Sequence, residues 1–144
     1  MTQEYIELLA TDISARVKHG VQVMLIENEE TMDRYKLYLK PYPLKPMTVL
    51  AFINHDVSGS KYKLNLGGDI VRIEDCKPLL RPMSDMSEEE KKEFSRLAVG
   101  THLFKGPLIP SYDTLDWVNK HHFDYRGLIE KGLAIALYFN APKK

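Results

Sequence analysis

The stretch DWVNKHHFDYRGLIEKGLA, residues 116–134, is the densest concentration of aromatic, histidine and charged residues in the chain. In its second half, Asp124 can cap a short helix and Gly132 can end that helix in the left-handed conformation. Arg126 follows Asp124 by two residues, close enough for a local ion pair. We interpret Asp124, Arg126 and Gly132 as a structural clamp, closed by the hydrophobic pair of a Schellman ending, Leu128 and Leu133.

The first half of this stretch predicts a helix with two different faces, which Asp113 can cap. At about 100° per residue, Trp117 and His121 share one face, and His122 lies on another beside apolar neighbours. We interpret His122 as a buried histidine that hydrogen-bonds to the backbone or to a carboxylate, and Trp117 with His121 as contact residues for a partner. Because metal ligands on a helix pair at i,i+3 or i,i+4 spacing, adjacent histidines do not favour a shared ion, and we predict no metal site.

The chain begins with an amphipathic helix, predicted within residues 1–20. Apolar residues recur at the helical period and form one stripe: Ile6, Leu9, Ala10, Ile13 and Val17. Asp12 and Arg16 are expected largely outside this stripe. His19 precedes Gly20, and both a cation and a glycine favour a helix end, so we interpret His19 as a C-terminal capping residue.

Between residues 21 and 82 the apolar period changes from 3.6 to 2, which indicates strands. Five short runs are predicted as strands, at residues 21–25, 35–39, 48–53, 62–66 and 70–73. The charged turn 27–30 separates the first two runs, and Gly67-Gly68 predicts a hairpin turn between the last two. The run 48–53 is apolar on both faces, so we expect it at the centre of the sheet.

These patterns predict an α+β fold: a small five-stranded antiparallel, SH3-like bent sheet or barrel with an N-terminal helix and C-terminal helical segments. Residues 83–144 supply those segments, since Ser87 and Glu90 form a capping box for a helix that packs through Phe94, Leu97 and Ala98 and ends at Gly100. Residues 101–111 are expected as an ordered loop packed on the barrel. Together, the helix (1–20), the barrel-like core (21–82) and the helical region (83–144) predict a single domain over residues 1–144.

Two features of the predicted sheet are further candidates for function. Tyr38 and Tyr42 can lie on its outer face as contact residues, although a tyrosine on a strand is also ordinary core or rim material. The predicted loop 54–60 carries His55 next to Asp56, a pair that can be a catalytic fragment. No nucleophile pattern accompanies the pair, which favours a polar turn instead.

Composition excludes several classes of protein. With 144 residues and 44% hydrophobic residues the chain can bury a core, and the single cysteine, Cys76, excludes an internal disulfide framework and favours a reducing cytoplasm. Lys plus Arg number 20 and Asp plus Glu number 20, without the basic cluster that non-specific nucleic-acid binders use. Because no apolar run approaches the ~20 residues of a membrane span, we expect a cytoplasmic protein with no membrane partner.

Three segments resemble a known group of proteins: an ARxxxGV-like step (Ala15, Arg16, Gly20, Val21), an I-x-D-x-K-P-x-L-R-P-M-S-x-M-[ST]-E-E-E segment (residues 73–90) and an N-x-H-x-x-D-Y-R-G-L-I-E-K-G-L-A segment (residues 119–134). Together they resemble small uncharacterised proteins from phages and prophages of Bacteroidetes-type gut bacteria. That group has no assigned activity, so the resemblance implies a bacterial host and no catalytic residues. The ending AIALYFNAPKK departs from the group.

Three hypotheses of function follow. The favoured one is a non-enzymatic binding module for a host protein or peptide. The second is a nucleic-acid or nucleotide binder that stacks bases on Tyr38, Tyr42 or Trp117. The third is an enzyme that uses His121, His122, Asp124, or His55 with Asp56. Because the sequence has no phosphate-binding glycine loop, HExxH, GxSxG or metal-spaced Cys/His set, we predict no cofactor and no catalytic residue.

Overall fold

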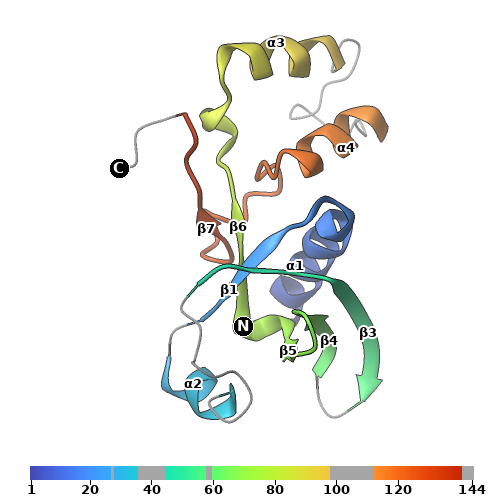
Figure 1. The fold of residues 1–144 in the computed structure, drawn as a ribbon, viewed down its shortest axis with the longest axis vertical. Coiled ribbons are helices and arrows are strands. Elements are labelled where there is room, and N and C mark those ends of the chain that lie inside the picture. The colour runs from blue at the N-terminus through green and yellow to red at the C-terminus, as the bar shows by residue number, and fades with distance from the viewer. Residues whose placement is uncertain (27, 36–44, 58–59, 98–111, 141–144) are drawn as a thin grey trace.

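The computed structural model describes residues 1–26, 28–35, 45–57, 60–97 and 112–140 of the chain, which has an α+β fold (Figure 1). Its helices are α1 (Gln3–Arg16), α2 (Glu29–Tyr35), α3 (Glu88–Leu97) and α4 (Tyr112–Lys120), with short 3-10 turns η1 (Val17–His19), η2 (Ile73–Asp75) and η3 (Met83–Asp85). Its strands are β1 (Gln22–Leu25), β2 (Met47–Thr48), β3 (Ala51–Val57), β4 (Ser60–Asn65), β5 (Ile70–Arg72), β6 (Cys76–Leu80) and β7 (Ile135–Ala136).

The strands form two sheets instead of the predicted single barrel. One sheet has the order β2-β1-β6-β7 and the other has the order β3-β4-β5. All pairings are antiparallel except β6 with β7, which is parallel. The α+β class and the N-terminal helix are confirmed, whereas the described strands do not close into a barrel.

The prediction of a central strand at residues 48–53 is wrong, because the chain changes sheets inside this run. The backbone N–H of Val49 donates to Val21 O at 2.9 Å, and that of Leu50 donates to Asn65 O at 2.8 Å. The preceding β2 and the following β3 are therefore edge strands of different sheets. Val49 is buried and Leu50 is exposed, so the apolar run reflects a crossing point and not a strand covered on both sides.

The charged segment predicted as a turn begins α2. Asn28 Oδ1 accepts from the backbone N–H of Thr31 at 2.8 Å, which is an N-cap, and Glu29 and Glu30 occupy the first turn, where negative charge suits the helix dipole. Tyr35 is the last residue of this helix, which contradicts a strand that begins there. The rest of that predicted strand, from residue 36, lies outside the described residues.

The hairpin turn at Gly67 and Gly68 is confirmed. Both glycines have positive φ (93° and 104°), and Asn65 Oδ1 accepts from both of their backbone N–H groups, at 3.0 and 2.8 Å. The predicted loop 54–60 is mostly strand, since β3 continues to Val57 and pairs there with Ser60 after a register shift. Strand pairing in this hairpin therefore extends further than the polar sequence suggested.

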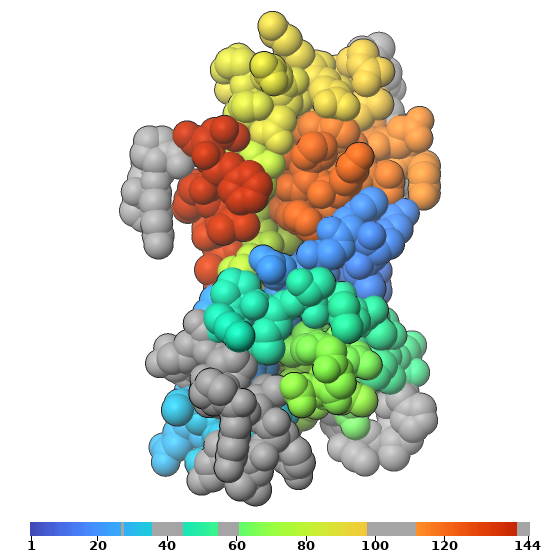
Figure 2. All heavy atoms as spheres, viewed as in Figure 1, coloured from blue at the N-terminus to red at the C-terminus, as the bar shows by residue number. Residues whose placement is uncertain are grey.

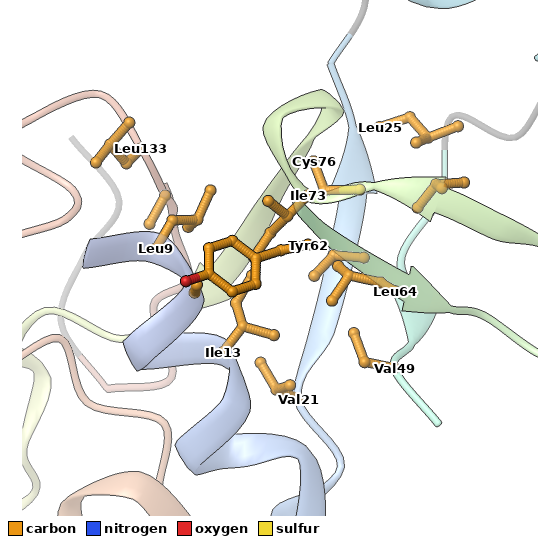
Figure 3. Packing of buried hydrophobic residues seen from close by; sticks show 14 of the residues in the cluster. Leu9, Ile13, Val21, Leu25, Val49, Tyr62, Leu64, Ile73, Cys76 and Leu133 are labelled. Atoms are coloured by element: carbon orange, nitrogen blue, oxygen red, sulfur yellow. The ribbon is translucent and has the colours of Figure 1, made fainter. Parts of the chain in front are cut away.

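A first hydrophobic core lies between α1 and the two sheets. Leu9 and Ile13 of the predicted helical stripe point from α1 toward the side chains of Val21, Leu64 and Ile73 (Figure 3). Each fully buried side chain of this kind contributes about 1.5–3 kcal/mol relative to an exposed one. The α1 helix thus connects both sheets, as its apolar period predicts.

A second hydrophobic core lies between α3 and α4 and consists of Met86, Trp117, Val118 and Phe123, with Met83, Phe94, Leu97 and Tyr125 partly buried around it. The capping box of α3 is confirmed: Glu90 N–H donates to Ser87 Oγ at 3.1 Å, and Ser87 N–H donates to Glu90 Oε1 at 2.9 Å. Phe94 and Leu97 pack as predicted, whereas residues 98–111 lie outside the described residues. Among the described helices, none combines the length and the apolar character that a membrane span requires.

Candidate binding groove

Two buried arginines hold the short segment 122–124 between the two cores. Arg16, at the end of α1, donates from Nη2 to Phe123 O at 2.6 Å, and the Arg81 guanidinium lies over the Phe123 ring at 4.2 Å from the ring centre. The backbone of Arg81 also donates to His122 O and accepts from the N–H of Asp124, both at 2.8 Å. Phe123 is therefore fixed through its carbonyl, its ring and both neighbouring peptide groups.

The Arg16 network contains more cations than carboxylates. Asp12 accepts from Arg16 Nε at 2.9 Å and from Arg16 Nη2 at 3.0 Å, and both side chains are fully buried. Asp12 Oδ1 also accepts from Arg126 Nη1 at 3.0 Å. The expectation that Asp12 and Arg16 lie outside the buried face of the first helix is wrong, because their mutual ion pair allows both to be buried.

The Arg81 network contains more carboxylates than cations. Arg81 donates from Nε to Asp85 at 2.9 Å and from its two Nη atoms to Glu90 at 2.9 and 2.8 Å. Hydrogen bonding from Arg81, assisted by Ser87, lowers the pKa of Glu90 to about 2. Asp85 in turn accepts from the backbone N–H groups of Phe139 and Asn140, at 2.9 and 2.8 Å. This network joins the residue after β6, the η3 turn, α3 and the residues after β7.

Four positions around these networks share one geometry. The residues Gly20, His122, Gly127 and Gly132 have positive φ, at 72°, 61°, 74° and 74°, and the residue after each is buried, namely Val21, Phe123, Leu128 and Leu133. The Schellman ending predicted at Gly132 is present, since Leu133 N–H donates to Leu128 O at 2.9 Å and Gly132 N–H donates to Ile129 O at 3.0 Å. The preceding segment forms turns and not the predicted short helix.

Asp124 closes the start of this turn, as its predicted capping role requires. Its Oδ1 accepts from the backbone N–H of Leu128 at 2.8 Å and its Oδ2 accepts from that of Ile129 at 2.9 Å. With both oxygens aimed at the turn, Arg126 pairs with Asp12 of α1 instead of with Asp124. The predicted local ion pair is therefore wrong, and Arg126 joins two segments that are distant in sequence.

His122 ends α4 in a backbone conformation that non-glycine residues rarely adopt. Because α4 stops at Lys120, His122 belongs to the reversal and not to a helix face. Its Nδ1 is buried without a hydrogen-bond partner among the described residues. Burial, followed by the nearby charge of Arg16, lowers the pKa of His122 to about 4, so the imidazole is neutral at pH 7.

A groove of about 620 Å³ runs beside these networks, between the end of α1 with η1 on one side and α4 on the other. Side chains of these helices meet in the space-filling view (Figure 2). The groove is lined by Ser14, Ala15, Val17, Lys18, Tyr112, Leu115, Asp116, Asn119, Tyr125 and Arg126. Tyr112, at its rim, is 72% exposed, and Asn119, in its wall, is only 7% exposed.

An ion cluster crosses the rim of the groove. Asp116 Oδ1 lies 3.0 Å from Lys18 Nζ and 3.1 Å from His19 Nε2. Hydrogen bonding from Lys18, followed by that from His19, lowers the pKa of Asp116. His19, predicted as a helix cap, thus contacts a second helix through its side chain, and Lys18 also donates to Tyr112 Oη at 3.3 Å.

The residues predicted to contact a partner divide into three groups. Trp117 is 6% exposed and packs against Phe94 and Phe123, with ring centres 5.7 and 5.6 Å away, so it is a core residue and its ring is not available at the surface. His121 is partly exposed and packs on Trp117 at 4.4 Å between ring centres, and burial lowers the pKa of His121. Tyr38 and Tyr42 lie outside the described residues.

The described residues give no support to a metal-dependent site. They contain no group of three or more His, Cys, Asp or Glu side chains placed to hold a metal ion. His55 and Asp56, considered as a catalytic fragment, lie on β3.

Sequence reasoning missed Asp12, Arg16, Arg81 and most residues of the groove. The sequence does contain a signal for the arginines, which is a spacing that occurs twice. Asp12 and Arg16 are oppositely charged and four residues apart, and so are Arg81 and Asp85. Such pairs are usually exposed on a helix, where they add little stability. A carboxylate and an arginine one turn apart within otherwise apolar segments would have been a reason to consider burial.

Comparisons of this chain with protein-family models, with curated proteins and with solved structures gave no match.

Proposed function

We propose that this protein is a non-enzymatic binding module that holds a segment of a partner protein in the groove between α1 and α4. The observation that carries the proposal is the composition of the groove. Two tyrosines and an arginine, residue types enriched at protein interfaces, line it together with apolar side chains: Tyr112, Tyr125, Arg126, Leu115 and Val17.

The rigidity of the groove walls supports the same proposal. The α1 wall is held by Arg16, which donates to Phe123 O at 2.6 Å, and Arg126 is held by Asp12 and by the Tyr125 ring at 4.5 Å. A preformed surface loses less conformational entropy on binding, which favours affinity. The resemblance to phage and prophage proteins supports a partner from the cytoplasm of a bacterial host.

The test is a pull-down from a bacterial host lysate with matched α1 variants. Ser14→Arg places a long side chain in the groove, whereas Thr11→Arg makes the same change of charge one turn earlier on the exposed surface of α1, outside the groove lining. Both original hydroxyls donate to a helix carbonyl, Ser14 at 3.2 Å and Thr11 at 2.9 Å, so the two variants lose comparable bonds.

We expect wild type and Thr11→Arg to capture the same protein before and after nuclease treatment, and Ser14→Arg to lose it. Equal capture by Ser14→Arg would contradict the groove as the binding site. Loss of the captured protein on nuclease treatment would instead support the nucleic-acid alternative.

A further inference from the structure

We propose that the segment bound in the groove presents a carboxylate to Arg126, so that the partner is an acidic protein segment. This inference rests on the proposed function and specifies the chemistry of the partner. It follows from the charge around the groove and the hydrogen-bonding state of Arg126.

The groove lining carries an excess of one positive charge. Its charged side chains are Lys18, Arg126 and Asp116. Behind the lining, Asp12 and Arg16 are both fully buried and offset each other. Lys18 is already engaged by Asp116 and by the Tyr112 hydroxyl, which leaves its ammonium one further donor, whereas two nitrogens of Arg126 have no partner among the described residues. A negatively charged group would restore the balance.

Arg126 has donors that no described residue occupies. Within the described residues its hydrogen bond is the one from Nη1 to Asp12, so Nε and Nη2 have no partner there. Its side chain is 21% exposed, and its guanidinium carbon lies 4.5 Å from the centre of the Tyr125 ring. A planar guanidinium donates two parallel hydrogen bonds to a carboxylate.

The groove favours a peptide carboxylate over a nucleic-acid phosphate. Nucleic-acid binding draws on clustered cations. The charged side chains of this lining are only Lys18, Arg126 and Asp116, which form no such cluster within the described residues.

The experiment uses two libraries of random short peptides, one with free and one with amidated carboxyl termini, screened against the full-length protein. We expect binding peptides to be enriched in Asp or Glu in both libraries. Enrichment confined to free termini would identify a chain-terminal carboxylate as the group bound. Because hydrogen bonds to charged groups are stronger, replacing the carboxylate of a selected peptide by an amide should weaken binding about 10- to 100-fold.

Arg126→Gln should abolish this difference between acid and amide peptides, while Arg126→Lys, which keeps the charge but not the fork, should retain part of it. Lys61→Gln removes an exposed cation outside the groove lining and should leave the ratio unchanged. Thermal unfolding of each variant verifies that it is folded. The ratio is measured within each variant, so a modest loss of stability does not affect it.

The outcomes separate this inference from the proposed function. One outcome is that Ser14→Arg blocks peptide binding while the protein binds acid and amide peptides equally well. This result would overturn the inference and leave the groove as the binding site. If no peptide binds, or if Ser14→Arg leaves binding unchanged, the proposed function fails and the inference fails with it. A carboxylate preference that survives Arg126→Gln would also overturn the role given to Arg126.

Discussion

Arg16 and Arg81 both hold Phe123, yet their surroundings carry opposite charge. Around Arg16 two cations share one carboxylate, since Asp12 pairs with both Arg16 and Arg126. Around Arg81 one cation serves two carboxylates, Asp85 and Glu90. The excess positive charge of the first network lies beside the groove, whereas the excess negative charge of the second is taken up by backbone donors.

The difference indicates which network serves stability and which is available for recognition. Arg81 uses all three of its nitrogens, and the Asp85 oxygens accept the N–H groups of Phe139 and Asn140. In the other network, Arg16 Nη1 is buried without a partner among the described residues, and Arg126 has two unused nitrogens there. Both networks hold the fold, and of the unused nitrogens those of Arg126, whose side chain is 21% exposed, are the ones available for the proposed ligand.

The largest expected effect is the loss of Arg81. Arg81→Met leaves two carboxylates without their cation, and breaking a buried pair in this way costs about 3–5 kcal/mol. Arg16→Met should cost less, because Asp12 keeps Arg126. Urea unfolding of both variants measures the difference, with the exposed Lys61→Met as a control expected within about 0.5 kcal/mol of wild type. If Arg16→Met were the more damaging change, the contrast between the networks would be incorrect.

Acid should weaken the Arg81 network. The folded-state pKa of Glu90 is about 2 against an ordinary 4.5, so its contribution is present above pH 4.5 and lost as the pH falls toward 2. The Glu90 side chain is 18% exposed, and solvent screens the part of its charge that it reaches. We therefore expect the free energy of unfolding to fall by about 2–3 kcal/mol across this range. Unfolding free energies measured across this window should show the slope in wild type and a flatter one in Glu90→Gln. An unchanged slope in the variant would remove Glu90 as its source.

A second pH range of changing stability is set by His122 and belongs to the Arg16 network. The pKa of His122 is about 4 in the folded state and 6.5 ordinarily, so the unfolded chain binds its proton first. Stability present above pH 6.5 should therefore fall by about 2 kcal/mol as the pH drops to 4. His122→Asn, which tolerates the left-handed conformation, should remove this dependence without affecting the lower window. If the free energy of unfolding falls in two separate pH ranges, each removed by its own variant, the distinction between the networks is supported. A single fall that both variants change would argue against it.

Local chemistry was readable from the sequence, and partners distant in sequence were not. The Gly132 ending, the Ser87–Glu90 capping box and the Gly67-Gly68 turn each depend on residues a few positions apart, so their patterns identify them. Arg126 instead pairs with Asp12, 114 positions away. Its partner is decided by how α1 packs against the C-terminal segment, which no local pattern records.

The same limit explains why a central strand and a surface position for Trp117 were predicted incorrectly. The crossing between sheets at Val49 has the apolar period of a central strand, so periodicity alone cannot separate the two. Trp117 faces α3, and a helix-face argument cannot tell solvent from a second packed helix. The groove residues were missed for a related reason, because α1 and α4 are separated by most of the chain.

Smaller effects are expected in the turn that carries Arg126. Asp124→Ala removes the acceptor of two backbone N–H groups and should cost about 0.5–2 kcal/mol. Gly132→Ala should cost about 1–2 kcal/mol from the left-handed backbone alone, since an added Cβ meets no atom within 4 Å. Thermal unfolding measures both. Full stability combined with loss of partner binding in Asp124→Ala would show that Asp124 belongs to the binding site and not to the clamp.

The most direct test of the division between the two networks is the affinity of one acidic peptide, selected against wild type, for Arg126→Gln and for Glu90→Gln, measured at neutral pH where both variants are folded. We predict that Arg126→Gln loses about 10-fold or more in affinity and that Glu90→Gln, although less stable, binds like wild type. Equal losses in the two variants, or a loss confined to Glu90→Gln, would contradict the assignment of recognition to the Arg16 side and stability to the Arg81 side.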